Sequence, residues 1–321
     1  MMAENVYLVT GSMGFIGAWT LYHLVRQGKQ AVSYDLSDRR DRVNLLLTQE
    51  EQSAIRFITG DLTHTEQVMR TIAEQGITHI IHLGALQVPF VRANPILGAQ
   101  VNVVGTANLF EAAKQHGIAH LAYASSIAVY GPPDRYPPGL IAPDAAHLPS
   151  TLYGVYKQAN EGMARVYWEE YQLSSTALRP YIVYGVGRDQ GLTSEPTKAM
   201  LAVAAGKPYH IAFSGVSQYQ LGSDVALQFI DAAERPLGGA FAFNLGGTPT
   251  AMHEIVSLMR QARPTAQVTV EDKALPFPIG FDDSPLRQHF PTVYQTPLAD
   301  GIRQTIEHFE ACLADGRLSA G

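Results

Sequence analysis

The chain has 321 residues, of which 46% are apolar and 16% charged, as expected for a globular protein with a substantial core. Its net charge of −6 and the lack of a long basic run argue against nucleic-acid binding, and no apolar stretch reaches the ~20 residues that span a bilayer. With no signal-peptide pattern and a single cysteine, Cys312, we expect a cytoplasmic protein without disulfides or a membrane partner.

Short apolar runs alternate with helix-period segments through residue 185. Strands are expected at 6–11, 31–35, 55–61, 78–85, 119–126 and 174–185, and helices at 15–28, 65–76, 94–117 and 153–171. This alternation predicts an α/β fold, a Rossmann-type doubly wound parallel sheet covered by helices on both faces. Beyond residue 185 the stretches are irregular and rich in Gly and Pro, which favours a smaller C-terminal substrate-binding lobe.

A glycine-rich segment, VTGSMGFIG (9–17), lies between the first strand and the first helix. Gly11, Gly14 and Gly17 let the backbone turn tightly and approach a pyrophosphate closely. Phe15 and Ile16 begin the helix, whose N-terminus attracts a phosphate through unpaired N–H groups and its dipole. Because the motif requires a preceding strand and a following helix, this context predicts a dinucleotide site.

Asp35 ends the second expected strand and indicates which dinucleotide binds. A carboxylate at this point accepts hydrogen bonds from both adenosine ribose hydroxyls and repels a 2′-phosphate, which favours NAD over NADP. Arg39 and Arg40 follow in the charge run SDRRDR and leave NADP as the less favoured alternative. We therefore expect residues 1–185, joined by 219–236, to form an NAD-binding Rossmann domain. Residues 186–218 and 237–321 would form the substrate-binding lobe.

A series of further motifs follows in order along the chain: GDL (60–62), HLGA (82–85), NVVGT (102–106), YASSIAVYG (123–131), YGVYK (153–157) and LRPYIVYG (178–185). With the GxxGxxG spacing of the glycine loop, the series resembles the extended short-chain dehydrogenase/reductase (SDR) family, which contains NAD-dependent nucleotide-sugar epimerases and dehydratases. The resemblance implies an oxidoreductase of carbohydrate metabolism. It also implies a homodimer built through the helices near 94–117 and 153–171.

The resemblance implies a catalytic trio of Ser126, Tyr153 and Lys157. Tyr153 and Lys157 are spaced i, i+4 and share a helical face, and a nearby ammonium lowers the pKa of a phenol. Tyr156 is turned away from Lys157 around the helix, so Tyr153 is the expected acid/base. The Ser126 hydroxyl would stabilise the alkoxide-like charge that develops on the substrate oxygen.

Other cofactor contacts are also implied by the resemblance. Asp61 and Leu62 would meet the adenine, Gly84 and Ala85 would line the cofactor with their backbone, and Lys157 would hold the nicotinamide ribose. Pro180 is a further expected cofactor contact. The histidines show no metal-binding spacing, so we expect no metal site.

The residues expected to meet the substrate depart from those of nucleotide-sugar enzymes. Ile182 stands where relatives carry a phosphate-binding Asn, Ser217 and Gln218 replace an Arg-Asp pair, and the stretch 268–284 lacks an expected arginine. A buried diphosphate needs charge-assisted donors, and arginine is the usual one. The departures favour hydride transfer between nicotinamide and a secondary alcohol or ketone of a small non-nucleotide sugar, polyol or hydroxy acid.

Alternatives remain open at this level. A nucleotide-sugar 4-epimerase, similar to UDP-galactose 4-epimerase, would retain its NAD and would need Arg188 or Lys198 as a phosphate contact. A non-catalytic NAD-binding regulator is disfavoured by the intact trio, and a dehydratase by Ile127-Ala128 after Ser126. The candidate substrate contacts are Gln87, Arg92, Ser125, Tyr181 and Arg188; Arg92 would pair with a substrate carboxylate.

Overall fold

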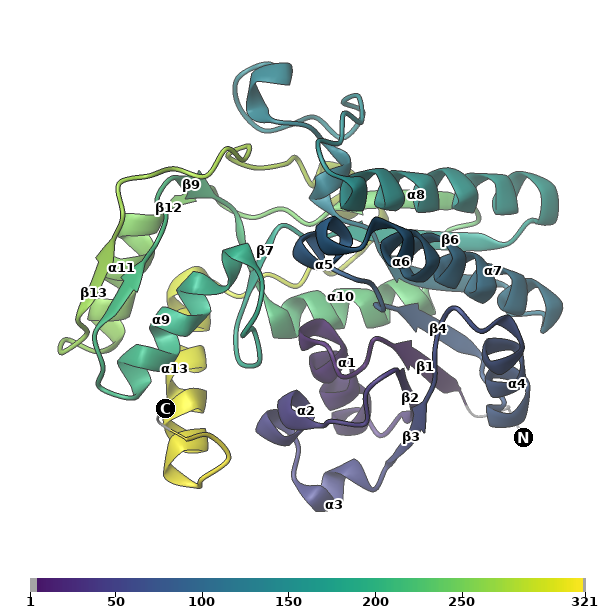
Figure 1. The fold of residues 1–321 in the computed structure, drawn as a ribbon, viewed down its shortest axis with the longest axis horizontal. Helices are drawn as coiled ribbons and strands as arrows, with labels where there is room; N and C mark the ends of the chain where they lie inside the picture. Colours follow the sequence, from purple (N-terminus) through teal and green to yellow (C-terminus); the bar gives the residue numbers. More distant parts are fainter. Residues whose placement is uncertain (1–4, 320–321) are drawn as a thin grey trace. The chain divides into compact units, whose positions relative to one another are not determined.

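The structure, a computed structural model, describes residues 5–319 and divides into two compact units (Figure 1). Unit 1 comprises residues 5–131, Ala146–Pro180 and Ala226–Asn244. Unit 2 comprises Pro132–Ala145, Tyr181–Val225 and residues 245–319.

Unit 1 is built on a seven-stranded parallel sheet with the order β11-β6-β5-β4-β1-β2-β3. Its strands are β1 (Val6–Thr10), β2 (Gln30–Asp35), β3 (Ile55–Thr59), β4 (His79–His82), β5 (His120–Ala124), β6 (Ser174–Arg179) and β11 (Ala240–Asn244). The predicted Rossmann-type sheet is confirmed. Because β2 and β4 lie on opposite sides of β1, the strand order reverses there, and ligands bind at the carboxyl ends of strands at such a point.

Helices connect these strands. They are α1 (Phe15–Arg26), α2 (Asp41–Leu46), α3 (Gln49–Gln52), α4 (Thr65–Gln75), α5 (Val88–Ala93), α6 (Pro95–Ala99), α7 (Gly105–Gln115), α8 (Leu152–Tyr171) and the short 3₁₀ turn η2 (Ile127–Val129). Helix α7 packs against α4 and against α8 (Figure 1). Ile72, Phe110 and Tyr167 of these helices are buried in one cluster with Leu8 and Leu121 of the sheet. This core holds the strand ends in fixed positions.

Two expected elements are divided in the structure. The helix expected at 94–117 contains a π-helical turn, η1 (Gln100–Val104), between α6 and α7. The strand expected at 174–185 stops at Pro180, and β7 (Ile182–Tyr184) pairs with β10 (Tyr219–Leu221) in unit 2 instead. Proline has no N–H for a strand ladder, which explains the break.

Unit 2 contains three small two-stranded sheets, β7–β10, β9–β12 and β8–β13. Its remaining strands are β8 (Tyr209–Ile211), β9 (Val216–Ser217), β12 (Thr250–Ala251) and β13 (Val268–Val270). Its helices are α9 (Glu195–Ala204), α11 (Met252–Ala262), α12 (Ser284–His289) and α13 (Leu298–Ala314), with 3₁₀ turns η3 (Pro133–Arg135) and η4 (Leu192–Ser194). Helix α10 (Gly222–Glu234) spans the boundary between the units.

The unit boundaries differ from the expected domain boundaries. Residues 132–145 and 181–185 fall in unit 2 although they were expected in the Rossmann domain, and residues 219–225 do the same. Conversely, residues 237–244 fall in unit 1, because β11 completes the main sheet. Which unit binds the cofactor and which the substrate stays a prediction. Within residues 5–319, every helix is too short or too polar to cross a bilayer.

Candidate functional site

The glycine loop joins β1 to α1 at the carboxyl edge of the sheet. Gly11 has φ +65°, a conformation that favours glycine, and a Cβ there would lie 2.6 Å from the Gly84 Cα. At Gly17 a Cβ would lie 2.3 Å from the Gly11 carbonyl oxygen. Helix α1 begins at Phe15, followed by Ile16, and no side chain caps its N-terminus. The loop is therefore tight, and the start of the helix suits an anion.

The Asp35 carboxylate lies at the end of β2, the neighbour of β1. Its Oδ2 accepts a hydrogen bond from the Met13 N–H at 2.9 Å, and its Oδ1 accepts one from the Ser37 N–H at 3.0 Å. These backbone donors fix the carboxylate beside the glycine loop. This is the placement that recognition of a ribose requires.

Arg39 and Arg40, the two arginines that kept NADP as an alternative cofactor, already have partners in unit 1. Arg39 pairs with Asp41 at 2.7 Å, and both side chains are exposed. The Arg40 guanidinium lies 3.5 Å from the ring centroid of Phe57, a cation–π contact. Neither contact depends on a 2′-phosphate, in keeping with the preference for NAD.

The other expected cofactor contacts also follow strand ends of the same sheet. Asp61 Oδ1 accepts hydrogen bonds from the N–H and the hydroxyl of Thr63, both at 2.8 Å. Leu62 packs on Gly84 so closely that a Cβ there would lie 2.6 Å from the Leu62 Cδ1. Gly84 and Ala85 follow β4, and Pro180 follows β6. Together with the glycine loop and Asp35, these residues fit a dinucleotide.

The segment after β4 is held by a residue of the π-helical turn. Asn102 is 1% exposed, and its Oδ1 accepts from the Leu86 N–H at 2.7 Å while its Nδ2 donates to the Leu86 carbonyl at 2.9 Å. The turn therefore fixes the backbone just beyond Gly84 and Ala85. A helical bulge of this kind reorients a side chain that a regular helix would point elsewhere.

The expected catalytic trio lies in unit 1, at two elements that pack against each other, η2 and α8. Ser126 is the N-cap residue of η2, just beyond β5, and its Oγ accepts a hydrogen bond from the Ala128 N–H at 3.1 Å. Tyr153 lies in the first turn of α8, and Lys157 lies one turn later. The Lys157 Nζ donates to the Ala124 carbonyl at 2.6 Å and is 5.8 Å from the Tyr153 ring centroid.

Lys157 is only 2% exposed, and this burial lowers its pKa to about 8, although the negative charge of Glu161 opposes the effect. His82 is buried beside it, and burial together with the charge of Lys157 lowers the His82 pKa to about 3. Its ring nitrogens contact the hydroxyls of Thr10 at 2.7 Å and Thr106 at 3.0 Å. His82 is thus a neutral core histidine with both nitrogens paired.

Tyr156 and Ser125, the neighbours of the trio, have other contacts. The Tyr156 hydroxyl donates to the Pro95 carbonyl at 3.0 Å. Ser125 is 2% exposed, and its hydroxyl donates to Glu161 Oε1 at 2.5 Å. This geometry turns the Ser125 side chain toward α8, which argues against its expected role as a substrate contact.

Two expected substrate contacts lie around α5 in unit 1. Gln87 is half-buried and precedes the helix as its N-cap residue. Arg92 is exposed in the last turn. Their proposed contacts with substrate stay predictions.

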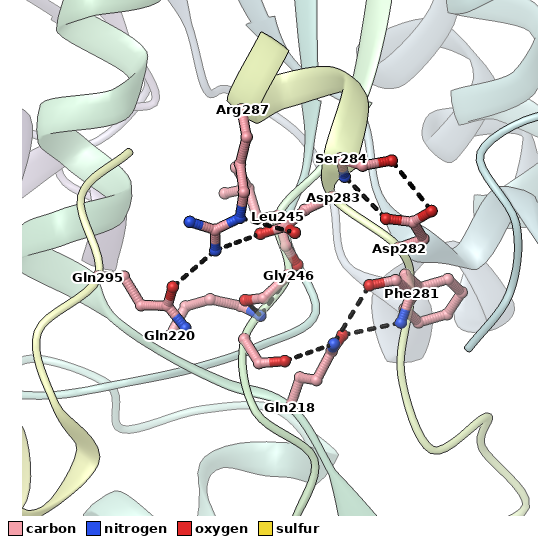
Figure 2. Close-up of polar contacts among 11 residues, drawn as sticks. Gln218, Gln220, Leu245, Gly246, Phe281, Asp282, Asp283, Ser284, Arg287 and Gln295 are labelled. Atoms are coloured by element: carbon pink, nitrogen blue, oxygen red, sulfur yellow. Dashed lines mark hydrogen bonds and ion pairs between the residues drawn. The ribbon is translucent and has the colours of Figure 1, made fainter. Parts of the chain in front are cut away.

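In unit 2, Gln218 occupies one of the positions where a phosphate-binding pair was expected (Figure 2). It is 1% exposed, and its Nε2 donates to the carbonyls of Gly247 at 2.7 Å and Phe281 at 3.1 Å. Its Oε1 accepts from the Phe281 N–H at 2.8 Å. The Gln218 amide therefore joins backbone segments of unit 2 and has no spare donor for a ligand.

The side-chain amide of Gln220 also binds backbone groups of unit 2. Its Oε1 accepts from the Tyr181 N–H at 2.9 Å. Its Nε2 donates to the Leu245 and Gly246 carbonyls at 3.1 Å each (Figure 2). The Tyr181 hydroxyl donates to the Pro278 carbonyl at 2.6 Å, and burial raises the Tyr181 pKa to about 12. Tyr181 therefore stays protonated at neutral pH.

Arg188 and Lys198, the cations expected to replace a phosphate-binding arginine, both lie in unit 2. Arg188 Nη2 donates to the Thr193 hydroxyl at 3.3 Å, and Lys198 Nζ lies 3.7 Å from a Glu195 carboxylate oxygen. Arg287, just beyond the stretch that lacks arginine, was not considered from the sequence. Its guanidinium makes a bidentate pair with Asp283, at 3.0 and 2.8 Å, and also donates to Gln295 at 2.7 Å (Figure 2).

Between residues 5 and 319, no group of three or more His, Cys, Asp or Glu side chains is arranged to hold a metal ion. The buried ion pair of Glu161 with Arg179 was not expected from the sequence. Its only signal was a carboxylate on α8 at the same helical spacing as Tyr153 and Lys157.

Comparison with known proteins gives the family of the chain. Residues 7–233 match the family described as the NAD dependent epimerase/dehydratase family. The chain belongs to this family. It is therefore an NAD-dependent enzyme of the extended SDR type, and NAD is its cofactor.

The relatives differ in how much of their own length this chain matches. The chain is 30% identical to the UDP-glucose 4-epimerase of Mycolicibacterium smegmatis over 317 residues, 94% of this chain and 97% of that protein. It is 35% identical over 204 residues to an uncharacterized 37.6 kDa protein of Escherichia coli O111:H-, of which the match covers 59%. The structure of the Thermus thermophilus UDP-glucose 4-epimerase in complex with NAD superposes with a TM-score of 0.79 and 26% identity, covering 95% of this chain and 98% of that one.

Proposed function

We propose that this member of the epimerase/dehydratase family is a nucleotide-sugar 4-epimerase that keeps NAD bound between turnovers. The observation that carries the proposal is the similarity to the M. smegmatis UDP-glucose 4-epimerase, which extends over 94% of this chain and 97% of that protein. Such a match includes the residues of unit 2 as well as the cofactor motifs. A small non-nucleotide substrate, the leading expectation from the sequence, receives no comparable support.

In the proposed reaction, residues of unit 1 act on the C4 hydroxyl of the sugar. Tyr153 accepts the hydroxyl proton and later returns it, while Ser126 donates a hydrogen bond to the same oxygen. The Lys157 ammonium favours the tyrosinate form of Tyr153. NAD, when bound, supplies a reversible hydride acceptor beside this trio.

The substrate diphosphate would need donors in unit 2. Gln218 has no donor to spare because its amide binds backbone groups. We assign the role to Arg188 or Lys198, the cations of unit 2 that the sequence offers in place of a phosphate-binding arginine.

A second candidate function follows from the residues that would meet the phosphates. Ser217, Gln218 and Ile182 stand where relatives carry phosphate-binding side chains. This favours an NAD-dependent dehydrogenase of a small sugar, polyol or hydroxy acid, with the same trio but with release of NADH.

One experiment separates the two. The purified enzyme is denatured and assayed for released NAD, and the native enzyme is incubated with UDP-glucose, UDP-glucuronate or UDP-N-acetylglucosamine while the 4-epimers are resolved by chromatography. The epimerase proposal expects NAD at near stoichiometry, formation of one 4-epimer and no net absorbance change at 340 nm. Sustained NADH formation with a small alcohol, and no epimer from any nucleotide sugar, would establish the dehydrogenase instead.

A further inference from the structure

Helix α8 presents three polar residues along one face, toward the end of β5. Tyr153, Lys157 and Glu161 are spaced by four positions, which places them one above another on the helix. Tyr153 and Lys157 belong to the proposed catalytic trio. Glu161 has no part in that trio, although its side chain is only 10% exposed.

Two of these side chains hold successive residues of the segment that carries Ser126. Lys157 Nζ donates to the carbonyl of Ala124, and Glu161 Oε1 accepts from the hydroxyl of Ser125. These bonds, of 2.6 and 2.5 Å, fix the backbone and the side chain immediately before Ser126. Helix α8 thus supplies both the acid/base pair and the groups that hold the neighbouring strand end.

Arg179 extends these hydrogen bonds to Tyr130, at the far end of the segment that carries Ser126. It is 5% exposed and binds Glu161 in a bidentate pair at 2.8 and 2.6 Å. Its Nη1 also donates to the Tyr130 hydroxyl at 2.8 Å and to Asn244 Oδ1 at 3.3 Å. Ser126 and the turn η2 that it caps therefore lie between two residues, Ser125 and Tyr130, that are both bonded to this ion pair.

A buried ion pair is a weak source of stability, because desolvation of both charges offsets their attraction. A well-packed apolar pair would hold α8 against the sheet at least as well. What the charged pair adds is a set of directed bonds to Ser125 and Tyr130. Such bonds fix distance and angle more narrowly than apolar packing does.

We propose that Glu161 is a positioning residue for the reaction. With Arg179 behind it, Glu161 holds Ser125, and through Ser125 it fixes the Ser126 hydroxyl relative to Tyr153. This inference rests on the proposed catalytic role of Ser126, and it names the residues that set the geometry of that role.

The direct test compares three variants of the full-length enzyme in the epimerase assay. Ser125→Ala removes one hydrogen bond and leaves the Glu161–Arg179 pair intact, so it should fold normally. We expect kcat to fall by about 10- to 100-fold, with KM within about twofold of wild type, because a misplaced reacting group slows the chemical step more than it weakens binding. Glu161→Gln should have the same effect or a larger one. Glu169→Gln, the same substitution in an exposed pair on α8, should leave kcat unchanged.

A double-mutant cycle shows whether the Ser125 hydrogen bond to Glu161 acts through Ser126. In a Ser126→Ala background the hydroxyl to be positioned is gone, so adding Ser125→Ala should lower kcat by less than about twofold further. The positioning role is wrong if the fold-losses in kcat of Ser125→Ala and Ser126→Ala multiply in the double variant. It is also wrong if Ser125→Ala alone retains wild-type kcat.

Hydrogen exchange tests the same contacts without any substrate. Peptides covering residues 124–131 should exchange at least about tenfold faster in Ser125→Ala than in wild type, and at the wild-type rate in Glu169→Gln. If this result holds but wild type converts no nucleotide sugar, the proposed function fails and the positioning inference stands; the kinetic arm then uses NADH formation from a small alcohol. Unchanged exchange in Ser125→Ala would overturn the inference regardless of the substrate.

Discussion

Tyr153 and Tyr156 are neighbours on α8 with different surroundings. Tyr153 shares a helical face with Lys157, whose ammonium lies 5.8 Å from its ring centroid. The Tyr156 hydroxyl is bound to the Pro95 carbonyl, away from Lys157. Of the two tyrosines, Tyr153 is therefore the one we propose for proton transfer assisted by a lysine.

Replacing each tyrosine by phenylalanine tests this assignment. Tyr153→Phe removes the acid/base hydroxyl, and we expect kcat to fall by about 10²- to 10⁴-fold. Tyr156→Phe loses one hydrogen bond to a backbone carbonyl and should keep kcat within about threefold of wild type. Steady-state kinetics of both variants measure the difference. A larger loss for Tyr156→Phe would reverse the assignment.

His82 gives the protein a predictable dependence of stability on pH. Its folded pKa is lowered to about 3, so between pH 3 and its ordinary value of ~6.5 the unfolded chain binds a proton that the folded chain does not. Stability is therefore lost as pH falls through this window. At pH 5 the loss is on the order of 2 kcal/mol.

His82→Gln should lose less stability than wild type between pH 7 and pH 5, by on the order of 2 kcal/mol. Glutamine keeps a donor and an acceptor for Thr10 and Thr106 and does not titrate. Urea unfolding at both pH values measures the difference, and the other histidines, present in both proteins, cancel. Equal losses for the two proteins would show that His82 does not titrate on unfolding.

Among the secondary-structure elements, α1 and α8 each contain a glycine, Gly17 and Gly162, and the two differ in how much space a side chain would have. A Cβ at Gly17 would lie 2.3 Å from the Gly11 carbonyl oxygen, within the turn that joins β1 to α1. A Cβ at Gly162, in α8, would meet no atom within 4 Å. The first glycine is required by the shape of the loop, and the second is not.

Gly17→Ala should displace the loop and weaken NAD binding by about tenfold or more, because the phosphate site depends on a close approach of the backbone. Gly162→Ala should leave NAD affinity unchanged and stabilise the protein by about 0.5–1 kcal/mol, since alanine costs less conformational entropy in a helix. Thermal unfolding with and without added NAD measures both effects. Wild-type NAD affinity in Gly17→Ala would contradict the role of this loop.

At the scale of the whole molecule, large apolar side chains remain exposed on neighbouring helices of unit 1. They include Ile96 on α6 and Val104 on η1, and also Val155 and Val166, which share a face of α8. Both α6 and η1 pack against α8. We call these four residues the helix patch; exposed apolar side chains gathered on one surface are typical of an interaction surface.

We expect the helix patch to form a homodimer, as the family resemblance implies. Val155→Glu places a charge in the patch and should shift the protein from dimer to monomer in sedimentation velocity. Leu192→Glu, at an exposed apolar residue of unit 2, is the matched control and should leave the dimer intact. Wild-type protein that sediments as a monomer at micromolar concentration would contradict the prediction.

The family, the cofactor and the parallel sheet could be predicted from the amino-acid sequence. They follow from local patterns, because strand and helix periodicities and the glycine loop depend on residues close together in the chain. That β11 completes the sheet and that Pro180 ends β6 became apparent only in the folded chain. It also revealed the contacts of Gln218 with Gly247 and Phe281, and those of Glu161 with Ser125 and Arg179. Each joins residues far apart in sequence, and only the packing of the folded chain determines which buried polar groups satisfy one another.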